Sequence, residues 1–142
     1  MDALKILVVD DELRIRKLLK DFLGKAGYVI IEAADGEEAL EIFENSGPYH
    51  FQAILMDVMM PIMDGMEAAR AIRACPLQDA ATIPIVALTA DTDPANEQKC
   101  LEAGMSACLS KPIDTALLFS TLYREIQKTQ EMSEVMEDSE EE

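Results

Sequence analysis

Five side chains that can bind metal or phosphate stand where apolar runs of the sequence end. They are Asp10, Asp11, Asp57, Thr89 and Lys111. Brought together, the three carboxylates would repel one another, because two like charges about 4 Å apart cost about 4 kcal/mol at an effective dielectric constant of 20. Such a cluster needs a cation or a raised pKa. A partly open site of carboxylate oxygens suits Mg²⁺, which also bridges phosphates, and Mn²⁺ prefers similar ligands.

A hydroxyl and an ammonium complete a set that fits phosphoryl transfer. Thr89 supplies the hydroxyl and Lys111 the ammonium, and a carboxylate can act as the nucleophile. A metal ion and the lysine would neutralise the phosphoryl oxygens, and positioning would supply most of the remaining catalysis. The hypothesis depends on the whole set. Taken alone, Asp10 and Asp11 are more typical of a helix cap.

The elements that must position this set alternate along the chain. Apolar runs predict strands over residues 4–10, 28–33, 51–57, 83–89 and 107–110. Helical spacing predicts helices over residues 15–26, 37–45, 66–74 and 94–103, and a last one capped by Asp114. Five such βα units indicate an α/β fold with a doubly wound, five-stranded parallel sheet covered on both faces. Sites in such sheets lie at the carboxyl ends of the strands. In the order 2-1-3-4-5, the first and third strands are neighbours and their aspartates converge.

Composition indicates one globular domain with a strong negative charge. The chain has 142 residues, with 28 acidic against 12 basic side chains and a net charge of −16. This balance disfavours direct nucleic-acid binding, which wants a basic surface. No apolar run approaches the roughly 18 residues that a membrane span needs. The N-terminus does not resemble a secretory signal, so we expect a cytoplasmic protein.

The last residues differ from the rest. Residues 130–142 carry seven acidic groups and no basic ones. We expect a folded domain over residues 1–129 and an acidic tail over 130–142, either disordered or a fraying extension of the last helix. The three cysteines lie far apart with no C-x-x-C pair, and we expect thiols in a reducing compartment. Among the methionines near Asp57, we expect Met59 and Met60 to be the exposed ones.

Four short motifs occur in order along the sequence. The runs VVDDE, ILMDVMMPIMDG, VALTAD and CLSKPID resemble, in order, the four motifs of receiver (response-regulator) domains. The resemblance covers about residues 3–128. Each motif alone is weak evidence, but the ordered set is strong. Chemotaxis-type single-domain regulators and the receivers of hybrid histidine kinases look most similar. The resemblance implies a flavodoxin-like (βα)5 fold with the strand order 2-1-3-4-5.

The resemblance also implies a metal site. Asp57 would be the phosphoacceptor and a ligand of Mg²⁺. Asp11 would bind the metal directly, and Asp10 would help to position it, often through water. The backbone carbonyl of Met59 would be the remaining protein ligand. Asp64 belongs to the third helix as its cap and is left out of the site.

The same resemblance assigns the phosphoryl contacts and the partners. Thr89 would hydrogen-bond the phosphoryl oxygen, and Lys111 would pair with Asp57 and later with the phosphoryl group, beside a cis Lys111–Pro112 bond. The donor would be a histidine kinase or a histidine phosphotransfer protein. The domain would catalyse its own modification and slow hydrolysis, without being an enzyme otherwise. Output to a downstream protein would use the surface of residues 94–103, 107–110 and the last helix. Many receivers have an aromatic residue where this chain has Cys108, so we expect the switch to use backbone shifts, or the output to depend little on that face.

Three other functions stay open. An aspartate-nucleophile phosphatase would want a D-x-D pair at the end of the first strand, where this chain has Asp10, Asp11 and Glu12. A pseudo-receiver usually lacks an acidic residue or the lysine, and this chain retains them. A flavodoxin-like FMN carrier would need a phosphate loop rich in glycine and hydroxyls after the first strand. Whether the domain is free-standing or part of a hybrid kinase also stays open.

Overall fold

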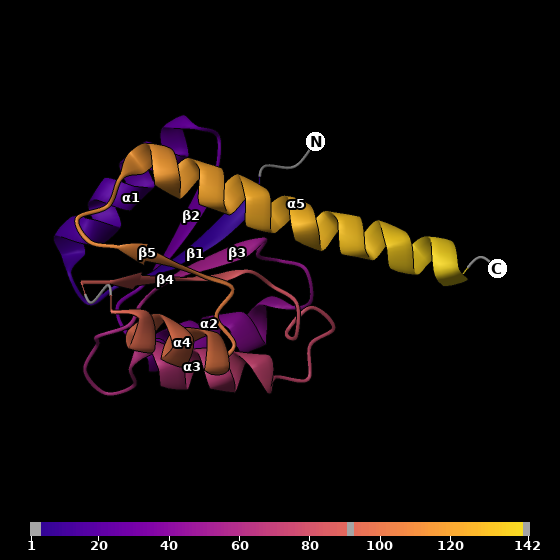
Figure 1. The fold of residues 1–142 in the computed structure, drawn as a ribbon, viewed down its shortest axis with the longest axis horizontal. Helices are drawn as coiled ribbons and strands as arrows, with labels where there is room; N and C mark the ends of the chain where they lie inside the picture. The colour runs from indigo at the N-terminus through magenta and orange to yellow at the C-terminus, as the bar shows by residue number, and fades with distance from the viewer. Residues whose placement is uncertain (1–3, 91–92, 141–142) are drawn as a thin grey trace.

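The chain folds as five strands that alternate with five helices. The computed structural model describes residues 4–90 and 93–140, with the backbone alone for 131–140. Within these ranges the elements are β1 (Lys5–Val9), α1 (Leu13–Lys25), β2 (Val29–Ala33), α2 (Gly36–Ser46), β3 (Ala53–Asp57), α3 (Gly65–Arg73), β4 (Ile85–Thr89), α4 (Pro94–Glu102), β5 (Ala107–Ser110) and α5 (Thr115–Glu140). The predicted alternation is confirmed (Figure 1).

The strands form one parallel sheet in the order β2-β1-β3-β4-β5, which confirms the predicted topology. All five residues of β3 and of β4 are buried, as expected for central strands with both faces covered. The register pairs Val9 with Met56 and Asp57 with Leu88. The carboxyl ends of β1, β3 and β4 therefore meet at one edge, although the chain visits them far apart in sequence.

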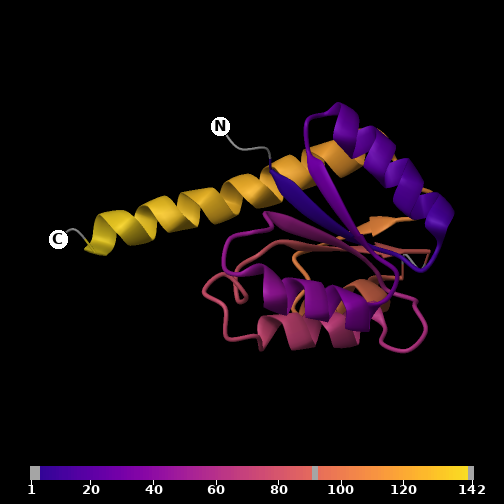
Figure 2. The ribbon, with the colours of Figure 1, turned by 180° about the vertical axis from the view of Figure 1, so that it is seen from behind.

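Side chains that alternate along each strand build two cores. Leu7, Ile54 and Ala87 belong to the core under α2, α3 and α4. Val8 and Leu55 belong to the core under α1 and α5. Figures 1 and 2 show these helices as two layers on opposite faces of the sheet. The two cores fix the sheet rigidly, so the loops at its carboxyl edge start from well-defined positions.

Aspartates cap the N-termini of α3 and α5. The side chain of Asp64 accepts a hydrogen bond from the backbone nitrogen of Glu67, which confirms its role as the cap of α3. Asp114 accepts from the nitrogen of Leu117 at the start of α5, also as predicted. These caps satisfy backbone donors that would otherwise have no partner in the first turn of each helix.

Helix α5 continues well beyond the sheet (Figures 1 and 2). Its backbone includes residues 130–140, whereas residues 141–142 and the side chains of 131–140 lie outside the described part of the chain. The division into a domain over 1–129 and a tail over 130–142 stays a prediction. Among the described residues, no helix combines the length and the apolar character that crossing a membrane requires. The three cysteines form no disulfide.

Candidate functional site

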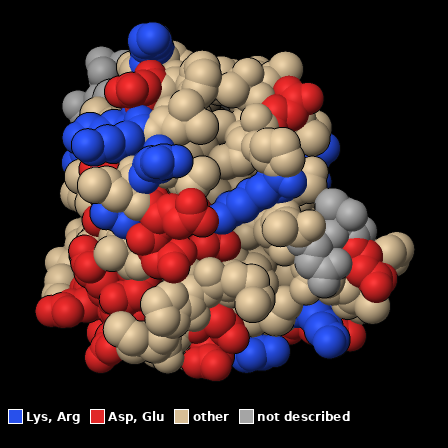
Figure 3. Space-filling model, turned by 90° about the vertical axis from the view of Figure 1, so that its left-hand side faces the viewer, with Lys and Arg blue, Asp and Glu red and all other residues tan. Residues whose placement is uncertain are grey.

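Three carboxylates meet at the carboxyl edge of the sheet. Asp10 follows β1, Asp11 comes next, and Asp57 ends β3. One carboxylate oxygen of each lies within 4.8 Å of the others. Asp10 and Asp57 are buried, at 0% and 3% exposure, whereas Asp11 is exposed. Figure 3 views this side of the molecule and shows acidic side chains gathered near its centre, with basic side chains beside them.

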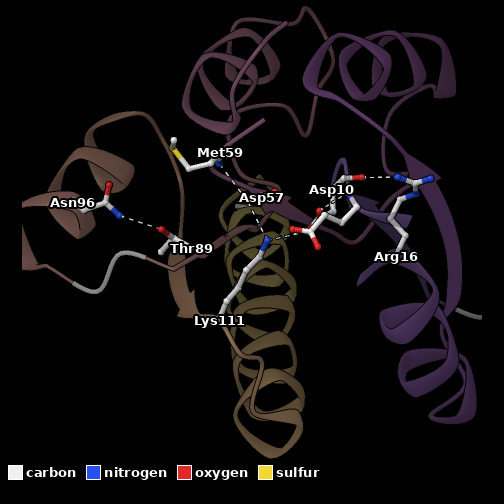
Figure 4. Close-up of polar contacts among 8 residues, drawn as sticks. Asp10, Arg16, Asp57, Met59, Thr89, Asn96 and Lys111 are labelled. Atoms are coloured by element: carbon white, nitrogen blue, oxygen red, sulfur yellow. Dashed lines mark hydrogen bonds and ion pairs between the residues drawn. The ribbon is translucent and has the colours of Figure 1, made fainter. Parts of the chain in front are cut away.

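One ammonium lies between two of these carboxylates. The Nζ atom of Lys111 is 3.2 Å from Oδ2 of Asp10 and 3.3 Å from Oδ1 of Asp57 (Figure 4). Lys111 lies in the loop from β5 to α5, and its backbone nitrogen donates to the carbonyl oxygen of Thr89. The Lys111–Pro112 peptide bond is cis, as the sequence led us to expect.

The charges of the site shift two pKa values. Burial and the neighbouring charge of Asp10 raise the pKa of Asp57 to about 6, although the charge and hydrogen bond of Lys111 act in the opposite direction. Burial by itself would lower the pKa of Lys111, but Asp10 and Asp57 outweigh it and raise that pKa above its usual value. With Asp11 included, one ammonium faces three carboxylates. The cluster therefore keeps a surplus of negative charge that a divalent cation would neutralise.

Thr89 lies at the same edge but points elsewhere. It is buried at the end of β4, and its Oγ1 atom accepts a 3.5 Å hydrogen bond from the side-chain amide of Asn96 in α4. Figure 4 shows this contact on the far side of Lys111 from Asp10. The hydroxyl that we expect to bind the phosphoryl group is thus connected to α4 in this structure.

The loop after Asp57 packs tightly against the site. The backbone nitrogen of Met59 donates to Oδ1 of Asp57 at 3.3 Å. The Met59 side chain is 77% exposed as expected, but Met60 is buried and the expectation of its exposure was wrong, because its side chain joins the core under α2 and α3. Gly65 donates from its nitrogen to the carbonyl oxygen of Val58. The carbonyl of Met59 as a metal ligand stays a prediction.

Two residues near the site were not identified from the sequence. Arg16 donates from Nη1 to the carbonyl oxygen of Asp10 at 2.6 Å, and Asn96 contacts Thr89. A signal for Arg16 was present, because it shares an inward-facing helical stripe with the buried Leu19 and Leu23. A charged residue in such a stripe usually has a polar partner. The sequence offered no comparable signal for Asn96.

Comparison with known proteins identifies the family to which this fold belongs. The family described as "Response regulator receiver domain" matches residues 6–123. This chain belongs to that family. It is therefore a receiver domain of two-component signalling, as the four motifs predicted, and the whole site lies inside the matched region.

The receiver domain is similar to parts of larger kinases. It is 40% identical over 121 residues to the sensor histidine kinase RcsC of Escherichia coli (strain K12), covering 85% of this chain and 12% of the kinase. It is 37% identical over 126 residues to the hybrid signal transduction histidine kinase I of Dictyostelium discoideum, covering 87% of this chain and 7% of that protein. The chain thus spans a small fraction of these relatives.

Solved receiver structures share the fold. The receiver domain of the sensor histidine kinase PA1611 from Pseudomonas aeruginosa PAO1, solved with a magnesium ion coordinated in its active site cleft, is 35% identical with a TM-score of 0.79. That match covers 89% of this chain and 99% of that one. The chemotaxis response regulator CheY4 of Vibrio cholerae is 36% identical with a TM-score of 0.78, covering 87% and 99% of the two chains. The receiver domain of a sensor kinase and a chemotaxis response regulator are therefore both among the similar structures.

Proposed function

We propose that Asp57 accepts a phosphoryl group from a phosphohistidine, in a reaction that this domain catalyses itself with a divalent cation. The observation that carries the proposal is the position of Lys111 between Asp57 and Asp10, beside a surplus of carboxylate charge. The donor would be a histidine kinase or a histidine phosphotransfer protein. Because the chain spans only a fraction of its curated relatives, the activity of any larger protein is part of this proposal.

The carboxylate of Asp57 is the nucleophile of the proposed reaction. One of its oxygens forms a bond to phosphorus while the bond from phosphorus to the histidine nitrogen breaks, and the imidazole leaves with the electron pair of that bond. Lys111 neutralises charge on the phosphoryl oxygens and Thr89 donates a hydrogen bond to one of them. Hydrolysis of the acyl phosphate by water later restores the carboxylate. We propose no turnover of other substrates.

Asp10, Asp11, Asp57 and the carbonyl of Met59 would hold Mg²⁺, or Mn²⁺ in its place. The donor set fits this cation because it consists of oxygens and carries surplus negative charge. The bound ion would supply positive charge for the transferred group. The magnesium ion in the similar PA1611 receiver supports the assignment.

Phosphorylation would change the surface formed by α4, β5 and α5. The new group adds about −1.5 to −2 charge and strong acceptor oxygens. Thr89 would leave the amide of Asn96 and turn toward the phosphoryl group, which would release a contact between β4 and α4. Cys108 on β5 is too small to report this change as a swinging aromatic ring would. We therefore propose that backbone shifts carry the signal to a downstream protein, without direct contact to nucleic acid.

The cellular setting belongs to the same proposal. The thiols of Cys75, Cys100 and Cys108 suit a reducing compartment, which supports a cytoplasmic location. Similarity to both hybrid kinases and single-domain regulators leaves two arrangements of the whole protein, a free-standing regulator or the receiver of a hybrid kinase.

The test is modification by a small phosphodonor. Wild type, Asp57→Asn and Asp64→Asn would be incubated with acetyl phosphate, with and without Mg²⁺, and followed by intact mass. We expect a Mg²⁺-dependent phosphoryl adduct on wild type and Asp64→Asn and none on Asp57→Asn. Beryllofluoride should shift backbone NMR signals around Thr89 with the same dependence. No adduct and no shift on wild type would instead indicate a pseudo-receiver.

A further inference from the structure

An arginine of α1 contacts the backbone of the acidic cluster. The side chain of Arg16 is only 15% exposed. Its Nη1 atom donates to the carbonyl oxygen of Asp10 at 2.6 Å, and its Nε atom donates to Oε1 of Glu32 at 3.2 Å. Figure 4 shows the first of these contacts, with Arg16 on the opposite side of Asp10 from Lys111. The guanidinium thus connects the loop after β1 to the strand β2.

The contacts of Asp10 show what this connection fixes. Its nitrogen donates to the carbonyl oxygen of Ala33, its carbonyl oxygen accepts from Arg16, and its Oδ1 accepts from the nitrogen of Glu12 at 2.9 Å. The peptide before Asp11 is therefore held by Arg16, and the peptide after it is held by the side chain of Asp10. Asp11 itself is exposed, and these two peptides fix the backbone from which its carboxylate extends.

We propose that Arg16 is a positioning residue for the divalent-cation site, because it fixes the Asp10–Asp11 peptide in the orientation that the two carboxylates need. This inference rests on the metal site of the proposed function. Glu32 has two roles in it. It orients the guanidinium through the Nε contact, and it offsets the positive charge that Arg16 brings near a cation site. Groups that hold metal ligands from behind typically change metal affinity by about 10- to 100-fold when they are mutated.

Geometry and net charge predict opposite effects for the loss of Arg16. A positive side chain close to a cation site repels the cation, so charge alone predicts that Arg16→Gln binds Mg²⁺ more tightly. Positioning predicts weaker binding, because the Asp10–Asp11 peptide loses its tether. Lys20 offers a matched control, since it also reaches Glu32, at 3.9 Å, but it is 58% exposed. Lys20→Gln makes the same change of charge one turn farther along α1.

The experiment is a Mg²⁺ titration of the whole chain, followed by backbone NMR shifts, on wild type and the two variants. We expect Arg16→Gln to weaken the affinity about tenfold and Lys20→Gln to leave it unchanged or slightly tighter. Lysine can reach one of the two acceptors but cannot contact both as the guanidinium does, so the Mg²⁺ affinity of Arg16→Lys should fall between those of wild type and Arg16→Gln. At saturating Mg²⁺, the rate of modification of Arg16→Gln by acetyl phosphate should return to within a few-fold of wild type.

Two results would overturn the inference. One is an affinity of Arg16→Gln equal to or tighter than that of wild type, and the other is an equal loss in Lys20→Gln. If Arg16→Gln does not fold, as judged by circular dichroism without metal, Arg16→Lys and Glu32→Gln replace it and must both weaken Mg²⁺ binding. Failure of the proposed function looks different, because wild type itself would then bind no Mg²⁺ in this titration or form no adduct with acetyl phosphate.

Discussion

The ammonium nitrogen of Lys111 lies 3.3 Å from Oδ1 of Asp57, in contact with the side chain that we propose as the phosphoacceptor. The same nitrogen also contacts Asp10, so one positive charge is divided between two buried carboxylates. Burial of Asp57, and after it the neighbouring charge of Asp10, explain why the pKa of Asp57 stays raised although a cation touches it. Asp57 is therefore costly to ionise until further positive charge arrives.

The stability of the metal-free protein should depend on this ionisation. The pKa of Asp57 rises from 3.8 to about 6 on folding, so its contribution to stability is complete below pH 3.8 and is lost as the pH rises through 6. Asp57→Asn has no carboxyl group at this position, so it does not lose stability in this way as the pH rises. Relative to wild type, the free energy of unfolding of Asp57→Asn should rise between about pH 4 and pH 6, by roughly 3 kcal/mol at most, and stay level at higher pH. Urea unfolding in EDTA would measure it, and a difference independent of pH would contradict the shift.

Replacing Lys111 should separate metal binding from phosphoryl transfer. Without its ammonium, the acidic cluster gains negative charge, so Lys111→Met should bind Mg²⁺ several-fold more tightly. At saturating Mg²⁺ it should react with acetyl phosphate at least about tenfold more slowly, because a charge that stabilises the transferred group is gone. Titration and intact mass would report the two effects. Lys25→Met, an exposed change in the last turn of α1, should alter neither.

Gly65 should tolerate no side chain. A Cβ atom there would collide with the backbone oxygen of Asp57 and lie 2.9 Å from Cα of Val58. Gly65→Ala should therefore push the loop away from Asp57, destabilise the protein by roughly 1–3 kcal/mol and slow phosphorylation. Gly24→Ala is the matched control, since nothing lies within 4 Å of its Cβ and its helical position predicts a gain of about 0.5–1 kcal/mol. Thermal unfolding of both variants tests the pair.

Arg73 should be a structural residue rather than a functional one. Its guanidinium donates to the carbonyl oxygens of Gly104 and Ala80 and to Oγ of Ser106. These contacts connect α3 to the loop before β4 and to the loop between α4 and β5. Burial lowers the pKa of Arg73. Arg73→Met leaves these acceptors without their donor and should cost about 2–4 kcal/mol. Arg70→Met, on the exposed side of α3, should cost less than about 0.5 kcal/mol in the same denaturant titration.

The order of the elements could be predicted, and the ends of the strands to within one residue, because each depends on local sequence. Asp57 and Thr89 end β3 and β4 as predicted. The starts were less accurate: the predicted strands began at Phe51 and Ile83, two residues early. Both side chains are buried, so they look like strand residues, but they lie before the sheet pairing begins. Apolar character reports burial, and it does not distinguish a strand from the segment that leads into it.

The contacts that hold the site in place could not be predicted in the same way. The bond from Arg16 to the carbonyl of Asp10 depends on how α1 packs against the sheet. The contact between Asn96 and Thr89 depends on the position of α4. Met60 was expected to be exposed because it lies in a loop, yet the loop folds back and buries it. Each of these outcomes is decided by tertiary packing. Spacing along the chain can show that Arg16 faces inward, but it does not identify the group that Arg16 contacts.

The separation of 101 positions between Lys111 and Asp10 has a consequence for biosynthesis. A ribosome delivers β1 and β3, with their carboxylates, well before it delivers the lysine that neutralises them. A nascent chain that stops after β4 would bring Asp10 and Asp57 together with no ammonium between them, and contacts of such long range form late in folding. Fast acceptance of a phosphoryl group would therefore require that synthesis has passed residue 111 and that β5 has joined the sheet.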